Sequence, residues 1–260
     1  MNIVVCVKQT PDTAATMTVD DGKASWGEAP LVLNPWDEFA VEQALVTQEA
    51  EGGQVTAICL GPETAEEALK QALAMGCDEA ILIHDPVFDS ADSLVASRVL
   101  VAGIQKLESV DLVFFGKSAV DTDTGVMGSQ VARRLGWPSL NLVAAISELD
   151  AGAKTITVER LLEEGRQVVS GPLPAVVSVV KEINEPRYPS FMGIRKASKA
   201  EIPRWSASDI GLEGDVQPAL TWPGISAPEM VGTKVEFIEG GDPVEIAGKL
   251  VDRLFEEKVI

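Results

Sequence analysis

The sequence predicts an α/β protein with a Rossmann-like, open and mostly parallel sheet that carries helices on both faces. Short apolar runs rich in strand-forming residues alternate with helical patterns of ten or more residues, which is typical of parallel sheets. These runs are apolar throughout rather than at alternate positions, as expected where both faces of a sheet are covered. The chain has 260 residues, of which 46% are hydrophobic, so a large core is available.

The first half of the chain is expected to alternate strands and helices regularly. Strands are expected at residues 2–8, 54–60, 79–83 and 111–115, and helices at 34–45, 63–75 and 90–107. The helix at 34–45 has clear start signals, because Asn34 is a good N-cap and Pro35 suits the first helical position. Asp37 lies in its first turn, where the helix dipole favours an acidic group. Residues 10–33 predict irregular structure, with a turn at 20–22 between two short extended pieces.

The second half of the chain changes character after Pro138. Extended runs at 141–148, 155–161 and 167–169, joined by turns, predict an antiparallel addition to the sheet edge, and 175–180 predict one more buried strand. Residues 205–241 are rich in proline and lack periodicity, whereas 242–257 predict an amphipathic helix. We therefore expect a nucleotide-binding α/β domain at 1–204. An extended C-terminal arm ending in a helix is expected at 205–260, packed on a partner subunit.

A polar loop after the strand at 112–115 is the candidate ligand site. Gly116 ends that strand, the loop covers residues 117–123, and a helix follows that Gly136 ends. In an open parallel sheet such a loop lies at the carboxyl ends of the strands, where ligands bind, and unpaired N–H groups at a helix start favour a phosphate. The glycines fit neither the dinucleotide pattern GxGxxG nor the Walker pattern. An ordinary strand-to-helix connection would look similar, and that alternative stays open here.

A second distinctive stretch follows the last predicted strand. Residues 187–204 carry five basic residues and one acidic residue in a chain whose net charge is −19. Bulky side chains lie beside these cations, flanked by prolines and a glycine: Tyr188, Phe191 and Met192. This composition suits a docking loop for an acidic partner surface. A surface excursion whose aromatic side chains pack back onto the core would have the same composition.

Composition excludes several classes of function. The negative charge argues against nucleic-acid binding, and no apolar run approaches the roughly 20 residues of a membrane span. The N-terminal stretch has no basic leader, so we expect a cytoplasmic protein. Three widely spaced cysteines and a single histidine predict no metal site. His84 has no GxSxG or cysteine nucleophile to serve, and we assign no catalytic residue.

Several ordered motifs together resemble one family. They are VCVKQTPD near the start, NPWDEFAVEQAL at 34–45, ALAMGCDEAI at 72–81, GKSAVDTDTGVMGSQVARRLGWP at 116–138 and LPAVVSVVKEINEPRYPSFMGIRKASK at 173–199. Along nearly its whole length the chain resembles the β subunit of electron transfer flavoproteins. The resemblance implies a heterodimer with an α subunit that carries the redox-active FAD. It also implies that this chain holds AMP and acts as an electron-carrier subunit rather than an enzyme.

The resemblance places the AMP between the first strand, the start of the 34–45 helix and the polar loop. It points to these residues: Cys6 near the adenine, Asn34, Asp37, Gly116, Asp121, Thr122, Asp123, Thr124, Gly125, Met127 and Gly128. Carboxylates repel phosphate, so we expect Asp121 and Asp123 to bind ribose hydroxyls or to cap backbone N–H groups. Thr124 and backbone amides would then face the phosphate.

The resemblance also assigns the 184–199 segment as a recognition loop for acyl-CoA dehydrogenase and related flavin-dependent dehydrogenases. Phe191 falls at the anchor position, where a leucine is usual, with Arg195 and Lys196 as charges at the rim. The expected partner-binding residues are Arg187, Tyr188, Phe191, Met192, Ile194, Arg195 and Lys196. A quinone-linked acceptor is a further candidate partner.

Two departures from the family pattern keep alternatives open. The loop reads DTDTGVMG, which is closer to a branch that binds a second FAD in place of AMP, oxidises NADH and bifurcates electrons. Leu161 replaces an acidic residue of the animal and proteobacterial branch, so that residue's role in interdomain motion does not carry over.

A different class of protein, a nucleotide-binding regulatory module of the stress-protein type, would have the same kind of sheet. It would leave the 184–199 segment and the extended arm unexplained.

Overall fold

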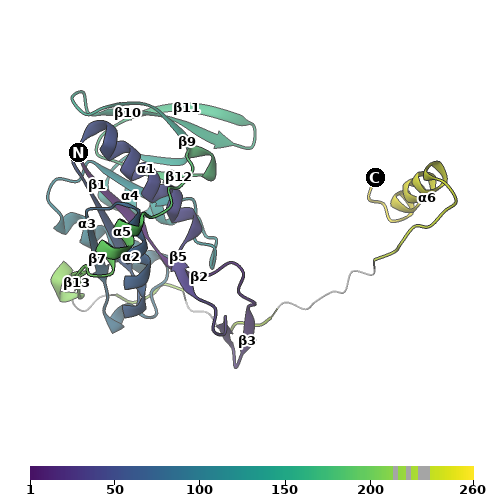
Figure 1. The fold of residues 1–260 in the computed structure, drawn as a ribbon, viewed down its shortest axis with the longest axis horizontal. Helices are drawn as coiled ribbons and strands as arrows, with labels where there is room; N and C mark the ends of the chain where they lie inside the picture. Colours follow the sequence, from purple (N-terminus) through teal and green to yellow (C-terminus); the bar gives the residue numbers. More distant parts are fainter. Residues whose placement is uncertain (213–215, 221–223, 228–234) are drawn as a thin grey trace. The chain divides into compact units, whose positions relative to one another are not determined.

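A nine-stranded sheet with the order β11-β10-β9-β12-β8-β1-β6-β7-β13 forms the centre of the first part of the chain (Figure 1). The computed structural model describes residues 1–212, 216–220, 224–227 and 235–260. These divide into two units, residues 1–224 and 225–260. The predicted fold class is confirmed, including the open and mostly parallel sheet, its antiparallel addition and the helix that follows the C-terminal arm.

The parallel part of the sheet accounts for most of the predicted strands. It comprises β1 (Asn2–Val7), β6 (Gln54–Leu60), β7 (Glu79–Ile83), β8 (Leu112–Gly116) and β12 (Ala175–Val179). Strand β1 pairs in parallel with both β6 and β8, so its carboxyl end lies beside the carboxyl end of β8. This arrangement brings the residues that follow β1 and β8 to the same edge of the sheet.

Three strands extend the sheet beyond β12, the first in parallel with β12 and the next two in antiparallel pairs. Strand β9 (Ser139–Asp150) pairs in parallel with β12 and antiparallel with β10 (Thr155–Leu162), which in turn pairs with β11 (Gly165–Pro172). At the opposite edge, β13 (Arg204–Trp205) pairs in parallel with β7. Sequence patterns did not predict β13, because two residues are too few to display a periodicity.

Helices cover both faces of the sheet, as predicted. Helices α1 (Pro35–Glu51) and α2 (Glu66–Met75) pack on one face, and α3 (Ser93–Lys106) and α4 (Met127–Leu135) pack on the other. Alternate residues of β1 supply the two cores: Ile3, Val5 and Val7 face α1 and α2, and Val4 and Cys6 face α3 and α4. Helix α3 begins three residues later than expected, because the Asp92 side chain caps it by accepting the Val95 N–H.

Residues 9–33 form two small antiparallel ladders. Strand β2 (Gln9–Pro11) pairs with β5 (Leu31–Leu33), and β3 (Thr18–Asp20) pairs with β4 (Lys23–Ser25) around the predicted turn. The ladder between β2 and β5 was not predicted. The remaining short elements are 3₁₀ turns: η1 (Glu63–Ala65), η2 (Pro86–Phe88), η3 (Lys181–Ile183) and η4 (Ser208–Ile210).

Helix α5 (Phe191–Ala197) packs closely on α2. Ser190 caps α5, because its hydroxyl accepts the Gly193 N–H at 2.9 Å. A Cβ atom on Gly193 would clash with the main-chain carbonyl oxygen of Ala74 in α2. The approach of the two backbones therefore requires glycine at this position.

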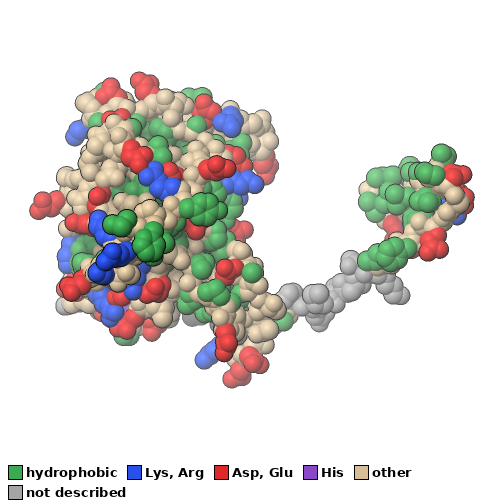
Figure 2. Space-filling model, viewed as in Figure 1, with side chains coloured by type: hydrophobic (Ala, Val, Ile, Leu, Met, Phe, Trp, Pro, Cys, Tyr) green, Lys and Arg blue, Asp and Glu red, His purple; other side chains and the backbone are tan. Residues whose placement is uncertain are grey.

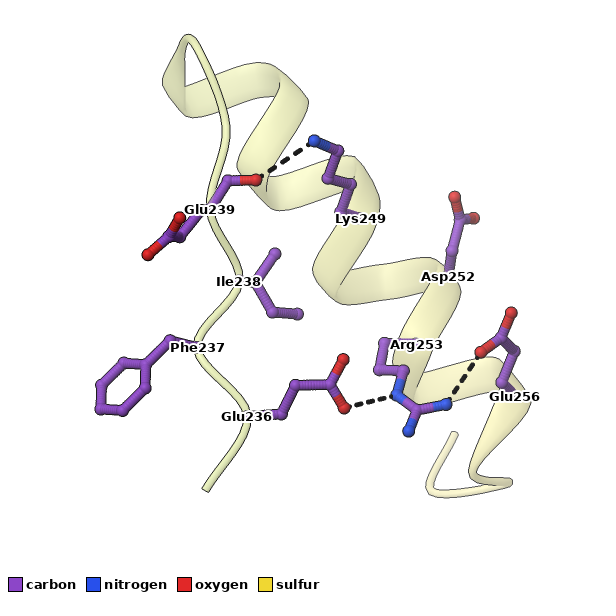
Figure 3. Close-up of a pocket in the computed structure, with 8 residues that line it drawn as sticks. All are labelled: Glu236, Phe237, Ile238, Glu239, Lys249, Asp252, Arg253 and Glu256. Carbon is purple, nitrogen blue, oxygen red and sulfur yellow. Dashed lines mark hydrogen bonds and ion pairs between the residues drawn. The ribbon is translucent and has the colours of Figure 1, made fainter. Parts of the chain in front are cut away.

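The second unit contains helix α6 (Pro243–Glu256), which Asp242 caps. The preceding residues lie along it and bound a shallow groove of about 290 Å³ (Figure 3). Arg253 binds Glu236 and Glu256, and the Lys249 ammonium donates to the main-chain oxygen of Glu239. Exposed apolar side chains remain on the helix, among them Val244 and Phe255. Among the described residues, no helix is both long and apolar enough to cross a membrane.

Replacing Gly193 by alanine is expected to loosen α5 from α2, because the added methyl group meets a main-chain oxygen that cannot move independently. Gly248 in α6 is a matched control, because it is also helical and a Cβ there meets nothing within 4 Å. In hydrogen exchange, Gly193→Ala should speed exchange of the α5 amides and Gly248→Ala should leave them unchanged. Unchanged α5 exchange in both variants would contradict this packing.

Candidate functional site

Asp37 joins three elements at the carboxyl edge of the sheet. Its carboxylate is buried and accepts the Lys8 N–H at 2.8 Å and the Gly116 N–H at 3.2 Å, so it ties the start of α1 to the ends of β1 and β8. A second bond supports the tie, because the Asn34 N–H donates to the Lys8 carbonyl at 2.9 Å. A Cβ atom on Gly116 would lie 2.6 Å from both the Asp37 Oδ1 atom and the Trp36 main-chain carbonyl, so this position also requires glycine.

Asn34 holds the polar loop instead of capping its own helix. It occupies the predicted N-cap position of α1, with Pro35 following, but its side chain makes no capping hydrogen bond. Its Nδ2 atom donates to the Ser118 carbonyl at 2.8 Å, and its Oδ1 atom accepts the Val120 N–H at 3.1 Å. The predicted capping role was wrong, because main-chain groups of a loop more than 80 residues away engage the same amide.

The two loop aspartates are engaged by residues that the sequence analysis missed. Asp121 pairs with the Lys8 ammonium at 2.7 Å, and Asp123 accepts the Ser118 hydroxyl at 2.6 Å. One of the two roles expected for these carboxylates was to cap backbone N–H groups, and neither of these bonds is of that kind. Lys8 directly follows a strand that ends at this edge, and that position was the available signal for it.

The start of α4 presents, beside this loop, backbone N–H groups that the helix itself leaves unpaired. Helix α4 begins at Met127, and Val126 at the N-cap supplies no side-chain acceptor. The N–H groups of the first turn, including that of Gly128, therefore have no partner within the helix, and the helix dipole favours an anion there. Thr122 and Thr124 are exposed in the loop, and Gly125 adopts a φ of +62°, which favours glycine.

Cys6 lies behind the loop in β1, on the sheet face covered by α3 and α4. It is buried, and burial raises the pKa of its thiol well above the usual value, with the Asp37 charge adding to the effect. The thiol is therefore neutral and behaves as a small apolar side chain. Among the described residues, no group of three His, Cys, Asp or Glu side chains is placed to hold a metal ion.

The 184–199 segment presents its bulky side chains to solvent. Tyr188 is 96% exposed and Phe191 is 79% exposed, and Met192 and Ile194 are also exposed. Hydrophobic and basic side chains gather over α5 (Figure 2), and the basic ones on this helix are Arg195 and Lys196. The aromatic side chains do not pack back onto the core, so the alternative of a self-packed excursion is wrong. Contact of these residues with a partner stays a prediction.

Arg187 differs from the other predicted partner-binding residues, because it is engaged within the chain. Its guanidinium pairs with Glu42 at 2.8 Å and with Glu49 at 2.7 Å, both on α1. Asn184 lies against the same helix, where its Nδ2 atom donates to the Phe39 carbonyl at 3.1 Å. Arg187 and Asn184 thus attach the start of the segment to α1.

The first unit is an α/β domain with two features that suggest a function. One is the polar loop and helix start at the carboxyl edge of its sheet, and the other is the exposed apolar and basic helix α5. The family model of the electron transfer flavoprotein domain matches residues 27–210. The chain therefore belongs to the electron transfer flavoprotein family, as the sequence motifs predicted.

Relatives match most or all of this chain. A protein of Acetobacterium woodii named caffeyl-CoA reductase-Etf complex subunit CarD is 39% identical, and the match covers the whole of both chains. The electron transfer flavoprotein subunit beta of Thermoanaerobacterium thermosaccharolyticum is 40% identical, again over the whole of both chains. Protein FixA of Azorhizobium caulinodans is 37% identical over 82% of this chain and 78% of its own. The chain is thus of the β-subunit type in this electron-transfer family.

The stability contributed by Asp37 is expected to depend on pH. Burial raises the pKa of Asp37 from 3.8 to about 7, against the opposing effect of the hydrogen bonds from the Lys8 and Gly116 N–H groups. A raised pKa means that the folded chain binds the proton more tightly than the unfolded chain. The resulting stabilisation is present below about pH 4 and is lost as the pH rises to about 7.

The Asp37→Asn variant removes this titration. Between about pH 4 and pH 8, the free energy of unfolding of the wild type should therefore fall relative to that of the variant, by an amount on the order of 2–4 kcal/mol. Urea denaturation of both proteins across this range measures the difference. A difference that does not change with pH would contradict the raised pKa.

Proposed function

We propose that this chain is the β subunit of a heterodimeric electron transfer flavoprotein. In this role it holds an adenine nucleotide, AMP, and docks flavin-dependent dehydrogenases, so that electrons pass through an FAD carried mainly by the α subunit. The observation that carries the proposal is the free start of α4 beside the loop that Asn34 and Asp37 hold at the carboxyl edge of the sheet. Full-length similarity to a β subunit supports the same role.

The chemistry of the donor set fits an adenine nucleotide. The N–H groups of Met127 and Gly128 and the Thr124 hydroxyl would bind the phosphate at the helix start. Asp121 and Asp123 would bind the ribose hydroxyls, and Thr122 and Gly125 belong to the same part of the loop. The neutral Cys6 thiol would line the adenine side of the site. Asn34, Asp37 and Gly116 would keep the loop in place rather than contact the phosphate.

The flavin supplies the redox chemistry of such a carrier, and the protein's task is to position it. The apolar face of α6 supports pairing with an α subunit. Val244 is 82% exposed and Phe255 is 61% exposed on this helix, and a partner subunit would cover them. Tyr188, Phe191 and Met192, with Arg195 and Lys196 at the rim, would form the docking surface for an acyl-CoA dehydrogenase or a related dehydrogenase.

An electron-bifurcating flavoprotein subunit is the second candidate. In that case the pocket holds a second FAD in place of AMP, and the heterodimer oxidises NADH. The observation that favours it is the full-length similarity to CarD, whose name places it in a complex of a caffeyl-CoA reductase with an electron transfer flavoprotein.

The nucleotide content of the purified heterodimer separates the two candidates. The chain is co-purified with its α subunit, denatured, and the released nucleotides are quantified by chromatography. One FAD and one AMP per heterodimer supports the carrier, whereas two FAD and no AMP supports bifurcation, with NADH oxidation as the next assay. Absence of any nucleotide beyond the FAD of the α subunit would contradict the proposed site.

Asn34→Ala is expected to lower the content of that second nucleotide, because the loop loses two hydrogen bonds to the Asn34 amide. The expected weakening of nucleotide binding is about tenfold, as for the loss of one to two net hydrogen bonds. Asn2→Ala is the matched control, because Asn2 donates to Ser109 at the other end of β1. Equal nucleotide loss in both variants would mean that Asn34 has no specific role.

Phe191→Ala is expected to weaken reduction of the heterodimer by its dehydrogenase while leaving flavin content normal. Loss of a central aromatic anchor raises the KM for the heterodimer by roughly 30-fold, the equivalent of about 2 kcal/mol. Met17→Ala is the control, because Met17 is also an exposed apolar residue but lies before β3. Loss of flavin in the Phe191 variant, or an unchanged KM, would count against docking through this segment.

A further inference from the structure

A buried carboxylate of α1 binds the start of the docking segment. Glu42 is only 6% exposed. Because glutamate is seldom buried without a partner, its burial calls for one. Its Oε2 atom accepts the Arg187 Nε–H at 2.8 Å and the Arg187 main-chain N–H at 3.1 Å, and its Oε1 atom accepts from Nη2 at 2.9 Å. One carboxylate therefore fixes both the guanidinium and the backbone of Arg187.

The same arginine has a second acidic partner of a different kind. Glu49 lies seven residues further along α1 and pairs with Arg187 Nη1 at 2.7 Å, but its side chain is 59% exposed. Exposed ion pairs contribute little, since water screens them and both side chains lose freedom. Glu42 is shielded from water and both of its oxygens accept hydrogen bonds from Arg187, so loss of Glu42 is expected to perturb this segment far more than loss of Glu49.

The docking residues follow directly after this attachment. Asn184 donates to the Phe39 carbonyl and to Gln43 at 3.4 Å, so residues 184–187 lie fixed along α1. Tyr188 comes next and is 96% exposed, and Phe191 follows on α5. Exposed side chains such as these have no packing of their own that sets their direction. Their orientation is set by the backbone on either side.

We propose that Glu42 is a positioning residue for partner docking. Its carboxylate holds the Arg187 backbone so that Tyr188 and Phe191 are presented in one orientation before the partner arrives. A surface that is already ordered loses less conformational entropy on binding, and its affinity is correspondingly higher. Glu42 itself need not touch the partner. This inference rests on the proposed docking function of the 184–199 segment.

The test measures steady-state reduction of the reconstituted heterodimer by a flavin-dependent acyl-CoA dehydrogenase, with the heterodimer as the varied electron acceptor. Glu42→Gln keeps the shape of the side chain but removes its charge, and it should raise the KM for the heterodimer by about tenfold. The kcat at saturation and the nucleotide content should stay unchanged. The matched control, Glu49→Gln, should change the KM by less than about twofold.

Arg187→Lys provides a second variant that leaves the buried acid in place. Lysine keeps the charge but lacks the planar fork of donors, so the KM should rise as it does in Glu42→Gln. This variant also covers the case in which Glu42→Gln fails to fold. An unchanged KM in Arg187→Lys would overturn the proposal. Equal effects of Glu42→Gln and Glu49→Gln on the KM would also overturn it.

A double-mutant cycle separates positioning from a general structural effect. In a Tyr188→Ala/Phe191→Ala background, neither of the two side chains that Glu42 is proposed to orient remains, so adding Glu42→Gln should raise the KM by less than about twofold. The same tenfold rise in both backgrounds would overturn the positioning role. If Phe191→Ala alone leaves the KM unchanged, the docking function itself fails. If Phe191→Ala raises it and Glu42→Gln does not, only the present inference fails.

Discussion

The burial of one carboxylate constrains much of this structure. A buried Asp37 must receive hydrogen bonds, and the donors it finds are the main-chain N–H groups that follow β1 and end β8. That requirement fixes the start of α1 against two strand ends and leaves no room for a side chain at position 116. The polar loop after β8 then begins from a fixed point, and Asn34 holds its next residues.

Helix α1 contributes to two candidate functional regions at once. Its N-terminal residues Asn34 and Asp37 shape the candidate nucleotide site, and Glu42 further along the helix secures the start of the exposed segment that carries Phe191. Because this helix packs on the sheet, both regions are attached to the same hydrophobic core. The surface that would dock a dehydrogenase and the pocket that would hold a nucleotide are therefore built on one element.

Sequence patterns predicted the fold well, because strands buried on both faces and glycine-ended helices leave local signals. They also located the polar loop, and the exposure of Phe191 agrees with its predicted place in a docking segment. They missed the partners of single polar groups: Asn34 with Ser118, Lys8 with Asp121, and Arg187 with Glu42. These pairs join residues more than 80 positions apart. Only the folded topology brings them together, so no local periodicity or capping rule contains them.

A crystal structure of the heterodimer with its co-purified nucleotide would show directly where the nucleotide binds. We expect a nucleotide at the carboxyl edge of the sheet, with a phosphate at the N–H groups of Met127 and Gly128. Asp37 would lie behind the loop, still bonded to the Gly116 N–H and not touching the phosphate. A nucleotide bound elsewhere on this chain, or one whose phosphate lies away from the start of α4, would contradict the account.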